Sequence, residues 1–200
     1  NIWWQTNRGK PRVLKIDPIA GTSELIGPSL GDNKYASIVE AGNGRLYCAP
    51  GDATHVLEID PITNVVRYIG PDLGPGQAKF VTACTSSLTG NVFAAPWKGK
   101  YMMEIMCGNQ VSRSSQEPQI RYIGSTSDTV RDERAPDDPE EQEVYLYSGI
   151  CEAQNKMIYA FPYSAMNLAE IQPDMGIIRD IPLHSVLEPN RSRFFEFCKP

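Results

Sequence analysis

The amino-acid sequence predicts an all-β fold, a β-propeller built from four-stranded antiparallel blades. Three observations predict it: a phrase that occurs twice, a fixed spacing between prolines and strands, and the lack of convincing helical periodicity. The phrase VLKIDPIAGTSELIGP at 13–28 returns as VLEIDPITNVVRYIGP at 56–71. The 200 residues include 16 Gly and 16 Pro, which indicates many turns between short strands. This length suits a single domain over 1–200.

The second and third strands of each repeat are located by a proline. In three copies a proline lies six residues before the next strand, which carries Glu at its third position and Ile at its fourth. The paired segments are RLYCAP with VLEID, NVFAAP with MMEIM, and MIYAFP with LAEIQ. A fourth copy opens the chain, where NIWWQT precedes VLKID with one extra loop residue. Such fixed spacing is expected of a structural repeat.

The fourth strand of each repeat follows a turn whose chemistry also recurs. Pro18, Pro61 and Pro173 each lie eight residues before an Ile, and Gly or Asn follows each proline three residues later. Proline presets φ for the turn, and Gly or Asn tolerates the left-handed conformation that closes it. The pattern predicts a hairpin with a bulge. The third copy departs from it, because Cys107 replaces the proline and Ile123 comes sixteen residues later.

One further strand precedes each strand that ends in proline, which completes a unit of four. These strands are rich in β-branched or aromatic residues and lead into turns such as the one at 41–44. They are KYASIVEA, KFVTACTS and VYLYSGICEA, with RFFEFC alone near the end. The unit repeats with periods of 43, 46 and 66 residues, which is typical of propeller blades. A solenoid would more often carry a helix or a shorter coil in each repeat.

The inventory of strands predicts how the ring closes. The chain supplies three strands of one unit, then three complete units, and finally the lone strand Arg193–Cys198. If this strand pairs with Asn1–Thr6, four complete blades result, and strands from both termini protect the edges of the sheet. We therefore predict four blades closed by the N- and C-terminal strands. The alternative is that these residues form part of a larger propeller whose other blades are missing.

The segment GRLYCAPGDATHVLEIDP at 44–61 resembles the repeat of a β-propeller family of algal and protist proteins. Repeats of that family read much like G-K-I-Y-C-x-P-x-x-A-T-x-V-L-E-I-D-P, and the similarity extends over most of the chain. The resemblance implies a propeller fold and says almost nothing about activity. The other copies depart from the pattern: Met106 and Cys107 replace the Asp-Pro, and WKGK at 97–100 replaces GDAT.

Composition and charge narrow the classes of function. The formal charge of −5 does not support nucleic-acid binding. No apolar run approaches the roughly 20 residues that span a bilayer, so no transmembrane segment is predicted. The opening NIWWQTN has neither the basic nor the apolar region of a signal peptide and starts without Met. We interpret the chain as mature or partial.

Five cysteines are spread widely along the chain, and no two have the CxxC spacing of a zinc or redox site. They are Cys48, Cys84, Cys107, Cys151 and Cys198. Three of them lie in apolar, strand-like runs, where a free cysteine behaves as a small hydrophobic residue. We expect reduced, structural thiols, which favours an intracellular or organellar compartment over secretion.

An acidic segment interrupts the repeat at 126–143, with eight acidic and two basic residues. It follows the fourth strand of one unit and precedes the first strand of the next, so we expect an inter-blade loop that supplies no strand. Its spacing is not that of a calcium-binding loop, and it has no aromatic anchor. A solvated loop is the simplest interpretation. A cation site or a docking arm for a partner are the alternatives.

Catalytic signatures are scarce, and no catalytic residue, metal ligand or cofactor is predicted. His55 and His184 are isolated in loops, and the motifs of hydrolases, zinc proteases and nucleotide-binding enzymes are absent. Propeller enzymes such as lactonases hold a metal in the central tunnel with carboxylates from inner strands. The first strands offer Glu40, Glu152 and Glu196, but near their ends, where glutamates that flank turns are the expected interpretation.

The best candidate site is the loop face. We define it as the end of the propeller formed by the loops between second and third strands and by the loops that join consecutive blades. It combines positive charge with Trp and Tyr, the residue types that concentrate binding energy at protein interfaces. The predicted partner-binding residues are Arg8, Lys10, Arg12, Asp52, His55, Trp97, Lys98, Lys100, Tyr101 and Tyr163. The alternative is an ordinary surface with Trp97 tucked between blades.

Two functions remain open from the sequence. The first is a non-catalytic scaffold or binding module, an accessory subunit of a larger assembly whose partners are other protein subunits. The second is a tunnel enzyme or small-ligand binder of the lactonase kind, with a divalent metal held by Glu40, Glu152 or Glu196. The scarcity of catalytic groups favours the scaffold, although propellers host many activities.

Overall fold

The structure is a computed structural model that describes residues 2–5, 12–30, 35–74, 78–98, 101–107, 117–124, 146–165 and 167–183. Some predicted features lie outside these ranges and stay predictions. They are the acidic segment 126–143, the closing strand Arg193–Cys198, His184, Glu196, and the basic residues Arg8, Lys10 and Lys100.

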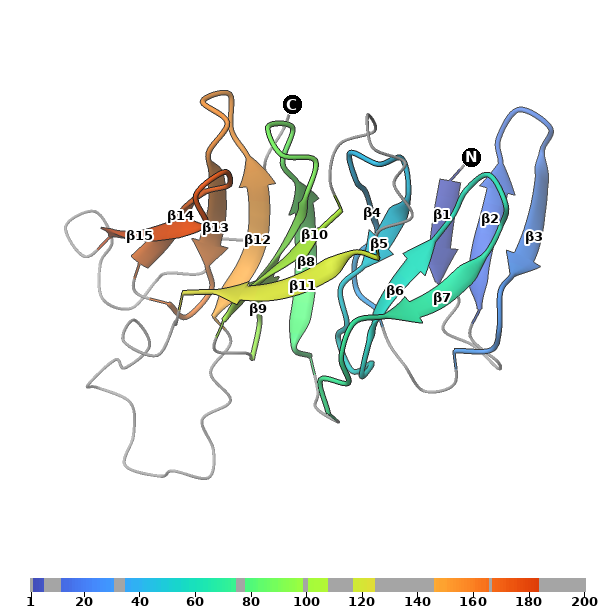
Figure 1. The fold of residues 1–200 in the computed structure, drawn as a ribbon, viewed down its shortest axis with the longest axis horizontal. Helices are drawn as coiled ribbons and strands as arrows, with labels where there is room; N and C mark the ends of the chain where they lie inside the picture. Colours follow the sequence, from blue (N-terminus) through green and yellow to red (C-terminus); the bar gives the residue numbers. More distant parts are fainter. Residues whose placement is uncertain are drawn as a thin grey trace.

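The described residues form 15 strands in four antiparallel sheets (Figure 1). The first sheet contains β1 (Ile2–Gln5), β2 (Val13–Asp17) and β3 (Thr22–Ile26). The second contains β4 (Val39–Glu40), β5 (Leu46–Cys48), β6 (Val56–Ile59) and β7 (Val66–Ile69). The third contains β8 (Phe80–Thr85), β9 (Val92–Pro96), β10 (Met102–Met106) and β11 (Gln119–Ile123). The fourth contains β12 (Tyr147–Glu152), β13 (Ile158–Pro162), β14 (Asn167–Gln172) and β15 (Ile177–Pro182).

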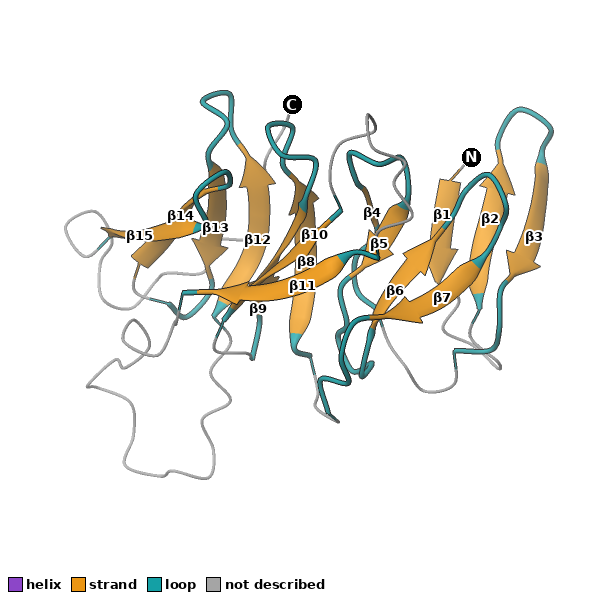
Figure 2. Cartoon of the chain, in the orientation of Figure 1, coloured by secondary structure: helices purple, strands orange, loops and turns teal. Residues whose placement is uncertain are grey.

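Each sheet is a meander in which strands that follow one another in the chain are neighbours. Figure 2 shows these strands connected by loops and turns, with no helix in the described ranges and therefore none there that could cross a membrane. The three-stranded start and the three four-stranded units that follow match the predicted organisation. The all-β prediction is confirmed.

Consecutive sheets lie side by side in a row, with β1–β3 at one end and β12–β15 at the other (Figure 1). Four-stranded antiparallel meanders stacked in this way are the blades of a β-propeller, so the predicted fold is confirmed. The strand predicted to close the ring lies outside the described residues. Closure by the two termini therefore stays a prediction.

The turns between third and fourth strands follow the predicted chemistry. Oδ1 of Asp17 accepts hydrogen bonds of 2.9 and 3.0 Å from the N–H groups two and three residues later, and Gly21 closes the turn with φ of 66°. Asp60 makes the same two bonds, and Asn64 closes its turn with φ of 59°. Gly176 has φ of 65° in the fourth sheet. The predicted left-handed positions are confirmed.

Each interface between consecutive sheets has its own apolar core. We call the face of a sheet that meets the next sheet along the chain its leading face, and the opposite one its rear face. Tyr47 and Val56 on the leading face of the second sheet pack against Ala94, Met103 and Ile105 on the rear face of the third, and all five are 0% exposed. Similar clusters lie between the first and second sheets and between the third and fourth.

A glycine that follows the last strand of three sheets lets the next sheet approach closely. These junction glycines have φ between 64° and 73°, and an added Cβ at each would overlap a side chain of the next sheet, which we call the facing residue. The pairs are Gly27 with Val66, Gly70 with Ile120, and Gly124 with Ile178. Both the conformation and the contact require glycine at these positions.

Candidate functional site

A row of polar side chains crosses each sheet at its middle strands. In the second sheet, the cross-strand partners Tyr47, Glu58 and Arg67 form this row. The Tyr47 hydroxyl donates to Glu58 Oε2 at 2.9 Å, while Arg67 Nε and Arg45 Nη1 donate to Oε1 at 2.7 and 2.8 Å. Because Glu58 is only 2% exposed, these bonds offset the lost hydration of its charge.

The polar row recurs in the third and fourth sheets. Glu104 accepts a hydrogen bond of 2.6 Å from Arg121 Nε. Glu170 accepts a bond of 2.7 Å from the Tyr159 hydroxyl and pairs with Arg179 Nη2 at 2.7 Å. In each sheet the acid lies on the third strand and the arginine on the fourth. The repeat therefore preserves an ion pair at one place in every complete blade.

The first sheet reverses the charges of this pair. Lys15 occupies the position of Glu58 and Glu24 that of Arg67, and Lys15 Nζ lies 2.9 Å from Glu24 Oε1. Lys15 Nζ also donates to Oδ1 of Asn64 in the second sheet at 3.1 Å. We assign the rows to holding the strands of each sheet together, because their carboxylates are bonded within their own sheets.

The described glutamates of the predicted tunnel, Glu40 and Glu152, lie at the ends of β4 and β12. Glu152 Oε1 accepts a hydrogen bond of 2.9 Å from the backbone N–H of Ser87, and the Glu40 carbonyl accepts one of 2.6 Å from Thr85 Oγ1. Both bonds connect neighbouring sheets. Within the described ranges, no three His, Cys, Asp or Glu side chains form a group that could hold a metal ion.

The cysteines differ in their chemical state. Cys48, Cys84 and Cys107 are free thiols, and burial raises the pKa of each to about 12. Cys151 on β12 is disulfide-bonded, so the expectation of reduced thiols is wrong for this residue. Spacing along the chain could not reveal the bond, because a disulfide depends on the distance between two Cα atoms in the folded protein.

On the loop face, backbone hydrogen bonds connect the ends of the third and fourth sheets. Trp97 N donates to Lys79 O at 2.8 Å, Leu146 N to Trp97 O at 2.7 Å, and Tyr163 N to Leu146 O at 2.8 Å. Trp97 and Tyr163 each follow the proline that ends the second strand of their sheet. Their ring centroids lie 5.0 Å apart at an interplanar angle of 51°, a favourable geometry for an aromatic pair.

Two lysines flank this aromatic pair. Lys98 follows Trp97 in the chain, and Lys79 is the backbone partner of Trp97. Lys79 Nζ donates to Gly74 O at 3.2 Å, and burial lowers the pKa of its ammonium group. We call the four residues Lys79, Trp97, Lys98 and Tyr163 the aromatic–basic patch. Each of the four residues is partly buried.

Tyr101 precedes β10 and contacts the outer strand of the same sheet. Its ring centroid lies 6.2 Å from that of Tyr122 on β11, and the two residues are 47% and 44% exposed. His55 and Tyr68 form the matching contact in the second sheet, with ring centroids 5.9 Å apart. These pairs belong to the outer edges of the sheets, whereas Trp97 and Tyr163 join two sheets.

Three of the predicted partner-binding residues form hydrogen bonds with nearby groups of this chain. Arg12 Nε donates to Gly27 O at 2.9 Å, at the end of the first sheet. Asp52 Oδ1 accepts a bond of 2.7 Å from the N–H of Ala78, which has φ of 52°. His55 Nδ1 lies 2.9 Å from the hydroxyl of the preceding threonine. The structure therefore brings together only part of the predicted set.

Sequence reasoning missed Lys79 and Tyr122. Lys79 lies in the stretch that leads into β8, where the loop face was expected, so its position alone could have indicated it. Tyr122 precedes Ile123 just as Tyr68 precedes Ile69, so the repeat itself carries the signal. Their contacts with other residues required the fold.

Comparison with known proteins supports the fold and leaves activity open. Streptogramin B lyase aligns with 92% of this chain and 51% of its own, at 12% identity and a TM-score of 0.62. An inactive virginiamycin B lyase from Staphylococcus aureus, solved with quinupristin, aligns with 92% of this chain and 55% of its own, at 12% identity and a TM-score of 0.59. A protein of unknown function from Bacteroides thetaiotaomicron covers 89% of this chain and 44% of its own, at 12% identity and a TM-score of 0.54.

This chain thus spans about half the length of the first two of these proteins. No protein-family model and no curated protein matches it. The solved structures share its β-propeller fold, and at this identity the likeness extends to the fold alone. The resemblance of 44–61 to the algal and protist repeat is not tested by these comparisons and stays a prediction.

Proposed function

We propose that this chain is a non-catalytic β-propeller scaffold that binds another protein through the aromatic–basic patch, as an accessory subunit of a larger assembly. The observation that carries the proposal is the 5.0 Å contact between the rings of Trp97 and Tyr163 where two sheets meet. Trp and Tyr are enriched among the residues that dominate binding energy at protein interfaces. Both residues are partly buried.

The patch is supported by the backbone rather than carried on a loose loop. The hydrogen bonds that link Lys79, Trp97, Leu146 and Tyr163 fix the positions of both aromatic residues. A surface that is already ordered loses less conformational entropy on binding. Lys98 adds positive charge, and the charge of Lys79 is partly offset by Asp52 and Asp72 near it. The positive charge favours a partner with an acidic surface.

The second function considered, a tunnel enzyme with a divalent metal, has no specific observation in its favour. The structural neighbours include lyases, but likeness at 12% identity supports only the fold. Among the described residues, the Glu152 carboxylate accepts a hydrogen bond from the neighbouring sheet, and the bond of Glu40 is made by its backbone carbonyl. Glu58 and Glu104 are bonded within their rows. The scaffold is therefore the function that the described contacts support best.

Affinity capture with a matched control tests the proposal. The double variant Trp97→Ala, Tyr163→Ala should lose the protein partners that co-purify with the wild-type chain. Ile62→Ala, at a turn of the opposite loop end that is 74% exposed, should keep them. Thermal melting of all three proteins shows whether the variants fold. If a folded double variant retains the same partners, the patch is not the binding site.

A further inference from the structure

Every interface inside the row joins a leading face to a rear face, and the two kinds of face carry different residues. Tyr47 and Val56 represent the leading face of the second sheet, and Met103 and Ile105 the rear face of the third. The rear face of the first sheet and the leading face of the fourth sheet are therefore the two ends of the row. The exposure of the two end faces therefore shows whether each is suited to a further sheet.

The leading face of the fourth sheet is less buried than its counterparts. Tyr159 and Leu168 occupy positions that are fully buried in the second sheet, yet both are only partly buried. The Glu170 side chain is 16% exposed, against 2% for Glu58. No described sheet follows on this side of the row (Figure 1). The apolar positions that fill an interface elsewhere are less fully buried here.

The rear face of the first sheet is open in the complementary way. Leu14 and Ile16 on β2 occupy the positions of Leu57 and Ile59, which are 1% and 0% exposed in the second sheet. Both residues of the first sheet are only partly buried. Each end of the row therefore presents an apolar face of the kind that the other end would pack against.

The contact positions at the two ends also fit each other. The fourth sheet has Pro182 where the other sheets have a junction glycine, and the first sheet has Ser23 where the others have a facing Val or Ile. Proline cannot adopt the positive φ of a junction glycine. A large facing residue needs that glycine, whereas the smaller Ser23 does not. Both changes agree with one interface between these two ends.

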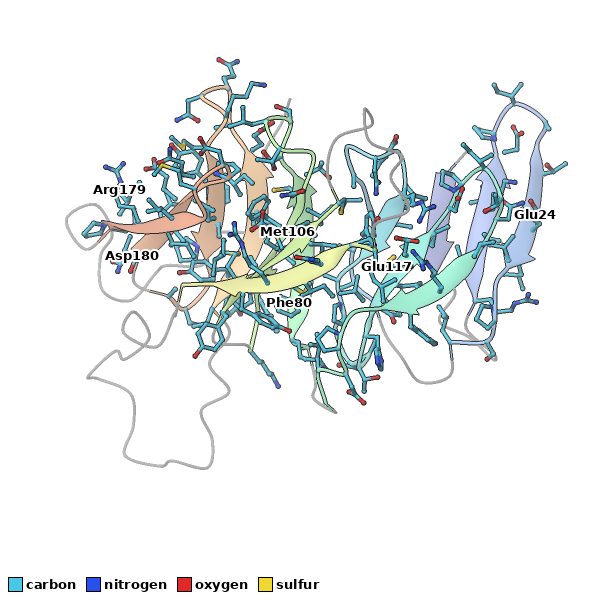
Figure 3. All side chains as sticks on the ribbon, in the orientation of Figure 1. Glu24, Phe80, Met106, Glu117, Arg179 and Asp180 are labelled. Carbon is cyan, nitrogen blue, oxygen red and sulfur yellow. The ribbon has the colours of Figure 1, made fainter. Side chains whose placement is uncertain are left out.

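An ion pair joins the second and third sheets, and its basic residue recurs at the leading end of the row. Inside the row, Arg67 Nη1 of the second sheet donates to Glu117 Oε1 of the third at 2.7 Å. Arg179 holds the position of Arg67 in the fourth sheet, and its side chain is 68% exposed. Figure 3 shows Glu117 between two sheets and Arg179 at one end of the row. In the first sheet Ala20 matches Glu117 in register, and the acidic residue beside this turn is Asp17, which matches Met106.

We propose that two copies of this chain join head to tail, the leading face of β12–β15 in each packing against the rear face of β1–β3 in the other. Twice the four sheets of one chain gives eight, the upper end of the usual range of four to eight blades. A head-to-tail contact forms a ring when its rotation closes and a filament when it does not. The two end faces correspond to the two kinds of face that pack together inside the row, so a second copy is the occupant we infer.

Complementation between two variants tests the direction of the contact. Leu168→Arg places a charge on the leading face, Leu14→Arg places one on the rear face, and Ile62→Arg on an exposed turn is the control. Analytical ultracentrifugation should find wild type and control at twice the chain mass of 22.2 kDa and each single variant at the chain mass. In a mixed dimer of the two single variants, one contact pairs an unaltered Leu168 with an unaltered Leu14, and the other contact holds both arginines. An equal mixture should therefore associate through the unaltered contact, more weakly than the wild type.

Several results would overturn the proposal. One is a wild-type chain that stays monomeric at all accessible concentrations, which is the result expected if the ring closes within one chain. The others are a filament and a mixture of folded variants that fails to associate. Circular dichroism shows whether each variant folds. If the arginine variants unfold, the surface pair decides: Arg179→Glu should raise the dimer Kd about tenfold, and adding Asp17→Lys should restore it. An unchanged Kd in Arg179→Glu contradicts the interface.

Discussion

The hydroxyl group of Tyr47 donates a hydrogen bond of 2.9 Å to Oε2 of Glu58, and both side chains are buried. A buried carboxylate without donors would be strongly destabilising. Burial, the largest influence, raises the pKa of Tyr47 above its usual range, so its hydroxyl stays protonated and remains a donor. The pair lets a charged residue lie on a leading face that packs against the next sheet.

Tyr47→Phe should lower the free energy of unfolding by about 1–3 kcal/mol, because a buried oxygen of Glu58 loses its donor. Phe93 occupies the matching position in the third sheet, so the ring itself fits. Urea unfolding measures the loss. Tyr159→Phe is the matched comparison and should cost less, since Glu170 is more exposed than Glu58. An unchanged midpoint for Tyr47→Phe would show that the row adds nothing to stability.

Gly70→Ala should destabilise the protein more than Gly21→Ala. Both glycines have positive φ, of 73° and 66°, but only at Gly70 would an added Cβ meet a side chain, that of Ile120. Gly21→Ala carries only the strain of a left-handed backbone, about 1–2 kcal/mol. Thermal unfolding compares the two, and adding Ile120→Ala to Gly70→Ala should recover part of the loss. Equal losses at both glycines would contradict the assignment of Gly70 as a junction glycine.

Exchanging the charges of both Lys15 and Glu24 should leave the free energy of unfolding nearly unchanged, whereas changing Lys15 alone should lower it. Lys15→Glu alone places two acids opposite each other and should cost up to about 1 kcal/mol. Adding Glu24→Arg creates the order found in the other three sheets and should recover most of that loss. A double-mutant cycle in urea measures the coupling. Strictly additive effects would mean that the 2.9 Å pair between Lys15 and Glu24 contributes nothing.

The free thiols should resist modification in the folded protein. Burial raises the pKa of Cys84 from 9.0 to about 12, and that of Cys48 and Cys107 likewise. Because the unfolded chain then releases these protons first, stability should be independent of them below about pH 9 and should fall between about pH 9 and 12. Thiol labelling at neutral pH, with and without denaturant, checks the exposure. Rapid labelling of the native protein would show that the thiols are accessible.

The sequence was sufficient to predict the order of the strands, because most second, third and fourth strands lie at a fixed distance from a proline. The turns at Asp17 and Asp60 were predictable from local sequence, since the side chain of each bonds to the N–H groups two and three residues later. Even in the third sheet, where Cys107 replaces the proline, β11 ends at the predicted Ile123. Local chemistry determines all of these features.

Contacts between sheets could not be predicted in the same way. The pairing of Trp97 with Tyr163 depends on which sheets are neighbours and how closely they pack. The disulfide bond of Cys151 depends on distance in space, and the overlap of Gly70 with Ile120 depends on the position of the next sheet. The repeated Glu and Arg positions were visible in the sequence, but their burial was not. Packing between repeats decides these features.

Site-directed photo-crosslinking tests the central claim, that the aromatic–basic patch binds another protein. A benzophenone amino acid at Lys98 leaves both rings of the patch intact, and one at Ile62, on an exposed turn, is the matched control. We predict that illumination of the native protein in its own extract joins position 98 to one or a few other protein chains and that position 62 yields none of them. The absence of adducts at position 98, or the same adducts at both positions, would contradict the claim.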